Sequence, residues 1–164
     1  MDSPVSHPEN KLFEAARRGD VPALQEALAA GIPIDTPDTK GFSALVLASY
    51  GDHLDATRFL LDQGANPNHQ DAGGNTALMG ISFKGYPAIA HLLIERGADL
   101  NRQNGGGSTA LMFAAMFGRH ELLQLLLDAG ADKDVKDARG LPARQLAGQQ
   151  GKETTLALLG AGPV

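Results

Sequence analysis

The most constraining feature of the sequence is an internal repeat with a period of 33 residues. Four columns of residues keep this step, namely Gly31, Gly64, Gly97 and Gly130; Leu12, Leu45, Leu78 and Leu111; Asp38, Asp71, Asn104 and Asp137; and Gly41, Gly74, Gly107 and Gly140. A fixed period of roughly 20 to 50 residues indicates a stack of units, each of which buries its apolar face against the next. We therefore expect one elongated domain.

Each unit has the pattern of two short helices. In the third unit, the apolar stretch 76–84 begins at Thr76, and a hydroxyl at that place can accept a hydrogen bond from a free N–H group at the helix start. Gly85 ends this stretch, because glycine readily adopts the left-handed conformation that closes a helix. A second apolar stretch, 89–96, then ends before Gly97. Stretch 121–129 has the same pattern in the fourth unit.

The segment after each second helix has the composition of a turn. Asp71-Ala72-Gly73-Gly74 and Asn104-Gly105-Gly106-Gly107 combine a side chain that can bond its own backbone with glycines that allow tight turns. We expect these segments to form extended fingers that resemble β-hairpins.

These motifs resemble the ankyrin repeat family. The Thr-Pro-Leu-His box of that family corresponds to Ser43-Ala44-Leu45-Val46, Thr76-Ala77-Leu78-Met79 and Thr109-Ala110-Leu111-Met112, and its Gly-Ala-Asp-x-Asn box to stretches 64–68, 97–101 and 130–134. The resemblance implies an all-α solenoid of about five helix-turn-helix units with finger loops. The predicted domain covers residues 11–162 after an N-terminal tail, 1–10, with units at about 11–37, 38–70, 71–103, 104–136 and 137–162.

The sequence departs from the family pattern in two places. No unit keeps the histidine of the first box, which commonly makes hydrogen bonds between repeats, so we expect Val46, Met79 and Met112 to replace it with apolar packing. Gly51 lies one residue early, which puts Asp52 in the usual glycine position and predicts an altered turn in the second unit.

The terminal units carry polar residues where a stack would otherwise expose an apolar end. We expect these residues to form two polar caps, Lys11, Glu14, Arg18, Gln25 and Glu26 at the start and Gln149, Gln150, Lys152, Glu153, Thr154 and Thr155 at the end.

Composition excludes several classes of function. The formal net charge is −5, which disfavours binding to nucleic acid or to anionic membranes, because both require clustered Lys and Arg. The chain has no Cys, so it forms no disulfide and no thiolate metal site. Neither a membrane-spanning stretch nor a signal segment is visible, and we expect a cytoplasmic protein, or a periplasmic one if a signal was removed.

No catalytic or metal site can be assembled from the sequence. The five histidines, His7, His53, His69, His91 and His120, have no partner at the spacing of metal ligands, and a surface or structural role is favoured for each. The run Gly105-Gly106-Gly107 lacks the lysine of a phosphate-binding loop, and segment 132–137 lacks the central glycine and final glutamate of a calcium loop. We expect a protein that is not an enzyme and has no cofactor.

One column of the repeat instead points to a binding surface. In the ankyrin family the position four residues after the first box faces solvent on the concave side, and here this column reads Arg17, Tyr50, Phe83, Met116 and Gln149. Exposed aromatic residues in a row are typical of an interaction site. The candidate partner-binding residues are Lys40, Phe42, Tyr50, Asn75, Phe83, Lys84, Met116, Phe117 and Arg139.

Three hypotheses for the function remain open. We favour a non-catalytic module, monomeric when free, that binds another protein through its concave surface of fingers and first helices. An alternative is an immunity protein, inhibitor or accessory factor of a neighbouring enzyme or toxin, such as a catalase or a secreted effector, which would dock on the acidic finger edge. A hydrolase or ligand-binding protein hidden in the stack is the third, and no residue is a candidate for that role.

Overall fold

The computed structural model describes residues 7–160, which form four pairs of α-helices and a fifth pair made of a 3-10 helix and an α-helix. The bounds are α1 Asn10–Arg18, α2 Val21–Ala29, α3 Ala44–Tyr50, α4 Leu54–Asp62, α5 Ala77–Lys84, α6 Pro87–Glu95, α7 Ala110–Met116, α8 His120–Asp128, the 3-10 helix η1 Ala143–Leu146 and α9 Lys152–Leu158.

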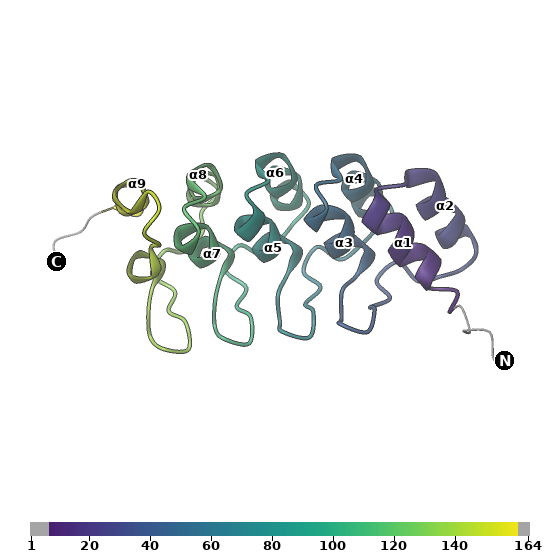
Figure 1. Cartoon of the computed structure of the whole chain (residues 1–164), viewed down its shortest axis with the longest axis horizontal. Coiled ribbons are helices and arrows are strands. Elements are labelled where there is room, and N and C mark those ends of the chain that lie inside the picture. The colour runs from purple at the N-terminus through teal and green to yellow at the C-terminus, as the bar shows by residue number, and fades with distance from the viewer. Residues whose placement is uncertain (1–6, 161–164) are drawn as a thin grey trace.

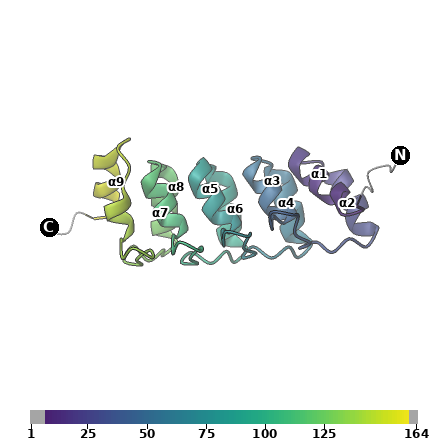
Figure 2. The same ribbon diagram turned by 60° about the horizontal axis from the view of Figure 1, so that its bottom comes forward.

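The pairs stack side by side along one axis, so the helices form two rows (Figure 1). The first row is α1, α3, α5, α7 and η1, and the second is α2, α4, α6, α8 and α9. The fingers between the pairs project together from one side of the stack (Figures 1 and 2). The fold is the all-α solenoid predicted from the repeat. Within residues 7–160 the fingers contain no β-strand, and their one antiparallel bridge joins Lys136 and Pro142.

The leucine column of the repeat forms the centre of the core. Leu12, Leu45, Leu78 and Leu111 lie on the first-row helices and are at most 1% exposed. Each buried leucine stabilises the fold by about 1.5–3 kcal/mol relative to an exposed one. Each unit buries its leucine against the neighbouring units, so the stack depends on contacts between consecutive units.

Threonine and methionine together begin the first helices of the third and fourth units. The Thr76 hydroxyl accepts a hydrogen bond from Met79 N at 3.3 Å, while Thr76 N donates to Met79 Sδ at 3.5 Å. Thr109 and Met112 repeat both contacts. The methionines are buried, as predicted for the position that holds histidine in the family. Their thioethers also take over part of a polar role, because each accepts a backbone N–H.

Hydrogen bonds between units come from histidines elsewhere in the repeat. His53 Nε2 lies 2.8 Å from Arg17 O, and His120 Nε2 lies 3.1 Å from Gly151 O and 3.0 Å from Thr155 Oγ1. Both histidines stand where a second-row helix begins, and each reaches a helix end of an adjacent unit: His53 the C-terminal end of α1, and His120 the N-terminal part of α9. The structural role predicted for them is confirmed, and the network that the missing box histidine would make is replaced by a different one.

The fingers are joined to one another through their main chains. Ala72 N donates to Lys40 O at 3.3 Å, Gly105 N to Gly73 O at 2.9 Å, and Ala138 N to Gly106 O at 3.0 Å. This approach requires glycine at Gly41, Gly74 and Gly107, because a Cβ atom at any of the three would lie within 3.0 Å of a backbone nitrogen of the next finger.

The repeat is regular at the turn of the second unit and irregular in the fifth unit. Asp52 has φ 62°, the one positive φ of a non-glycine residue within residues 7–160, and this value is close to those of Gly19 and Gly118 at the equivalent positions. The turn of the second unit therefore keeps the conformation of the other turns, and the predicted alteration was wrong because aspartate can enter the left-handed region. In the fifth unit a 3-10 helix replaces the first α-helix.

The C-terminal cap is only partly polar on the outside. Thr155, predicted as an exposed cap residue, is fully buried. That prediction was wrong because His120 of the preceding unit binds the Thr155 hydroxyl and draws it into the interface. The domain bounds 11–162 stay a prediction, since residues 161–162 and tail residues 1–6 lie outside the described part.

Candidate functional site

The candidate binding column faces outward. Tyr50 and Phe117 are 43% and 41% exposed, which makes them the exposed large apolar side chains of the described chain, while Phe83 and Met116 are half-buried. All four lie at the ends of the first-row helices or next to them. The leucines on the opposite side of the same helices are buried, so the orientation follows from the helical phase of the repeat.

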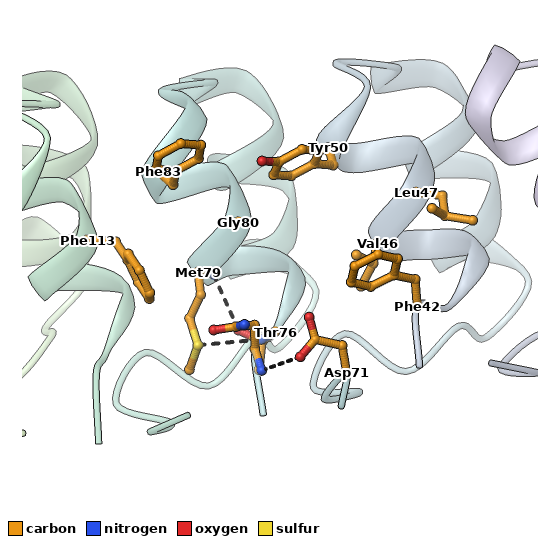
Figure 3. Close-up of a pocket in the computed structure, with 11 residues that line it drawn as sticks. Phe42, Val46, Leu47, Tyr50, Asp71, Thr76, Met79, Gly80, Phe83 and Phe113 are labelled. Carbon is orange, nitrogen blue, oxygen red and sulfur yellow. Dashed lines mark hydrogen bonds between the residues drawn. The ribbon is translucent and has the colours of Figure 1, made fainter. Parts of the chain in front are cut away.

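An apolar groove of about 310 Å³ lies between α3 and α5 (Figure 3). Its lining residues come from the fingers and first helices of three consecutive units, namely Phe42, Val46, Leu47, Tyr50, Asp71, Asn75, Thr76, Met79, Gly80, Phe83 and Phe113. Four of the predicted binding residues therefore line one groove: Phe42, Tyr50, Asn75 and Phe83.

The groove exists because the third unit has a glycine where its neighbours have large side chains. Gly80 is in register with Leu47 of the second unit and Phe113 of the fourth, which both line the groove. The missing side chain leaves a notch between the large apolar side chains of Leu47 and Phe113. Tyr50 extends from the end of α3 toward Gly80 and bounds the notch (Figure 3).

Aromatic contacts position the residues around this notch. Lys84 Nζ lies 4.9 Å from the centroid of the Tyr50 ring, and a cation over a ring face is attracted by its electrons. Phe83 meets Phe117 edge to face with ring centroids 4.7 Å apart. The predicted residues Lys84 and Phe117 thus border the groove through their contacts with Tyr50 and Phe83.

Three of the predicted residues are separate from the groove lining. Lys40 is exposed on the finger that also carries Phe42, Arg139 is exposed on the fifth finger, and Met116 lies on α7. Arg139 donates two hydrogen bonds to the same oxygen of Asp137, from Nε at 3.1 Å and from Nη2 at 2.8 Å to Oδ2. Backbone N–H donation, from Leu141 above all, and this guanidinium hold the pKa of Asp137 below its ordinary value.

Gly80 and Phe113 were not predicted as site residues, and Asp71 was predicted only as part of the acidic finger edge. The signal for Gly80 was present, because it interrupts a column of large apolar residues in the aligned repeats. Exposed aromatic side chains mark the rim of the groove, whereas the small size of Gly80 creates the space between them.

The acidic finger edge has a structural explanation. Oδ1 of Asp38, Asp71 and Asp137 each accepts two backbone N–H groups of its own finger turn at 2.9–3.0 Å. Asp99 and Asp132 each accept one from the residue two positions further on. These aspartates therefore shape the turns, and a role in docking on an enzyme is not needed to account for them.

The described residues show no candidate metal site and no membrane-crossing helix. Within residues 7–160, no three His, Asp or Glu side chains come close enough together to hold a metal ion. None of the helices there is both long and apolar enough to traverse a bilayer.

Comparison with known families agrees with the architecture. A family model described as "Ankyrin repeats (3 copies)" matches residues 12–104, which is more than half of the chain. The chain belongs to the ankyrin repeat family. A second model, "Ankyrin repeats (many copies)", matches residues 81–140. Ankyrin repeats are generally protein–protein interaction modules, and the family is typically non-catalytic.

Similar ankyrin proteins occur in vertebrates and bacteria. The chain is 42% identical over 62 residues to "Ankyrin repeat domain-containing protein 29" of Danio rerio, which covers 37% of this chain and 21% of that protein. It is 39% identical over 57 residues to "Putative ankyrin repeat protein YahD" of Escherichia coli, covering 35% and 28%. A third relative is "Inactive serine/threonine-protein kinase TEX14" of Mus musculus, 36% identical over 62 residues, or 38% of this chain and 4% of that protein. The matched segments thus span less than a third of each ankyrin relative.

Proposed function

We propose that this ankyrin chain acts as a non-catalytic module that binds another protein through its face of fingers and first helices. The residues proposed to contact the partner are Lys40, Phe42, Tyr50, Asn75, Phe83, Lys84, Met116, Phe117 and Arg139. The observation that carries the proposal is the exposure of Tyr50 and Phe117 on the face that also holds the apolar groove. Exposed aromatic residues around a hollow are typical of protein interaction sites.

The rigidity of the stack supports binding with little loss of entropy. The fingers are held by main-chain hydrogen bonds between units, and the first-row helices are packed on the leucine core. A surface that is already ordered before it meets its partner loses little conformational freedom on binding. The chain therefore needs no rearrangement to present the groove.

Affinity capture from the native source, followed by mass spectrometry, tests the proposal. Tyr50→Asp and Phe117→Asp place a charge in the proposed interface, and we expect each to reduce retention of the partner at least tenfold. Ala88→Asp is the matched control, because it adds the same charge at an exposed position of α6 in the second helix row. Equal retention by all three variants, with unchanged helical content, would show that this face is not the interface.

A further inference from the structure

The notch over Gly80 has the dimensions of an anchor site. Its volume of about 310 Å³ is at the lower limit of small-molecule pockets, which are roughly 300–1,000 Å³. Such a space suits one large side chain better than a cofactor. The walls are apolar on both sides, with Val46 on α3 and Met79 on α5 (Figure 3). Burial of an apolar side chain between such walls is favourable.

The lower end of the notch carries a carboxylate with one uncommitted oxygen. Asp71 Oδ1 accepts hydrogen bonds from Gly73 N and Asn75 N, both at 2.9 Å, which leaves Oδ2 available. The equivalent aspartates of other fingers are paired, Asp38 with Arg17 at 3.3 Å and Asp137 with Arg139 at 2.8 Å. Among residues 7–160, Asp71 forms no salt bridge of this kind, although it lines the groove.

The upper end of the notch has the opposite charge. Lys84 lies over the ring of Tyr50, which bounds the groove above Gly80 (Figure 3). A segment that follows the notch thus meets a negative group at the finger and a positive group at the helix ends. This distribution of charge selects for a partner with a basic residue on the finger side, since like charges there would repel.

We propose that the notch over Gly80 receives one leucine or phenylalanine side chain from a peptide segment of the partner protein, and that a neighbouring lysine or arginine of that segment pairs with Asp71. This inference rests on the proposed function, because it names the chemistry of the partner at the same face. A lysine or arginine of that segment would donate an N–H to Asp71 Oδ2, the oxygen that accepts no hydrogen bond from the finger turn.

The repeat itself supplies variants that test each half of the proposal. Gly80→Leu fills the notch with the residue that the second unit carries at Leu47. Asp71→Asn removes the charge and keeps the turn, since Asn104 Oδ1 accepts the same two backbone bonds in the fourth unit, at 3.0 and 2.9 Å. Circular dichroism and thermal melting verify that both variants are folded. Gly80→Ala, which narrows the notch by one methyl group, replaces Gly80→Leu if leucine disturbs the helix.

The experiment selects phage-displayed random dodecapeptides on the immobilised full chain and measures the affinity of the enriched peptides by calorimetry. We expect enriched sequences with Leu or Phe adjacent to Lys or Arg. Their affinity should fall about 30-fold or more for Gly80→Leu, the loss typical of a filled anchor pocket, and about threefold to tenfold for Asp71→Asn. Peptides without a basic residue, or equal affinity for Asp71→Asn, would overturn the ion pair.

A separate result distinguishes this inference from the proposed function. Phe117→Asp alters the face outside the notch lining. If a captured partner is lost with Phe117→Asp and retained in full by Gly80→Leu, the face binds protein but the notch is not its anchor, and the inference is overturned alone. Self-association that sedimentation detects, and that Gly80→Leu abolishes, would identify a second copy of this chain as the occupant and overturn it as well.

Discussion

The ring of Tyr50 lies directly against Gly80. A Cβ atom built on Gly80 would be 3.2 Å from Cδ2 of Tyr50 and 3.5 Å from its Cε2. Two helices of successive units thus meet where a backbone without a side chain faces an aromatic ring. The ring is 43% exposed and can swing toward solvent, so a small side chain at residue 80 is accommodated by movement of Tyr50.

Gly80→Ala tests this contact through stability. Alanine in a helix interior stabilises it by about 0.5–1 kcal/mol relative to glycine, and the displaced Tyr50 ring should offset part of that gain. In a Tyr50→Ala background the offset disappears, so the full gain should be measured there. Urea unfolding of the four variants gives the coupling energy. Identical gains in both backgrounds would show that the ring does not press on residue 80.

Because His120 bonds across the boundary between two units, its substitution should destabilise the fold more than substitution of an exposed histidine. His120→Ala removes the hydrogen bonds to Gly151 O and Thr155 Oγ1, leaving a buried hydroxyl without this partner, and should lower the free energy of unfolding by about 1–3 kcal/mol. His91→Ala is the control, because His91 is exposed on α6 and its one polar side-chain contact within residues 7–160 is with Glu95 of its own helix. Its effect should stay within about 0.5 kcal/mol. Equal losses would contradict a role for His120 at the interface.

Substitution of Gly97 should destabilise the fold through backbone conformation alone. Its φ is 90°, and a Cβ atom there would meet nothing within 4 Å, so a substitution strains the backbone without a clash. We expect Gly97→Val to lower the free energy of unfolding by about 1–3 kcal/mol, or the melting temperature by about 2–4 °C for each kcal/mol. Gly97→Asn should cost less, because asparagine enters the left-handed region more easily. An unchanged melting temperature for Gly97→Val would show that the positive φ is absent in solution.

The ionised carboxylate of Asp137 should make the stability of the fold depend on pH. Its pKa is lower in the folded chain than the ordinary value of 3.8, because Leu141 N and Arg139 donate to the ionised carboxylate. The ionised form therefore stabilises the fold above about pH 4, and this contribution is lost as the pH falls through the folded pKa. Asp137→Asn should be less stable than the parent at pH 7 and approach it near pH 3.

Thermal melting of the two proteins across this range measures the effect. Asp55→Asn is the control, since the Asp55 side chain is 92% exposed and its substitution should give a difference that hardly varies with pH. If Asp137→Asn shows the same flat difference, the carboxylate is not held in its ionised form by the fifth finger.

The parts of the fold that depend on local chemistry could be read from the sequence. Gly85 and Gly97 end helices with positive φ, as their place in the repeat predicts, and Thr76 begins one by accepting a backbone hydrogen bond. In each case the conformation is set by the residue and its immediate neighbours along the chain.

Features that form between units were harder to predict from the sequence. Thr155 is a polar residue in the polar terminal segment, and for that reason it was expected to be exposed. Its burial follows from its position beside His120 of the preceding unit. The aromatic column predicted which face is exposed, while the notch depends on the absence of a side chain at Gly80 and on the ring of Tyr50 from another unit. The groove is formed by side chains from three consecutive units, so the residue pattern of a single unit does not predict it.

The finger contacts described above separate the geometry of the molecule from its chemical surface. Successive fingers are linked amide to carbonyl, with glycine backbones in direct contact, so the pitch from one unit to the next is set by main-chain atoms. Residues 47, 80 and 113 lie on the first-row helices and take no part in these main-chain links. The spacing of the units therefore stays the same along the chain, while the side chains that each unit exposes differ from one unit to the next.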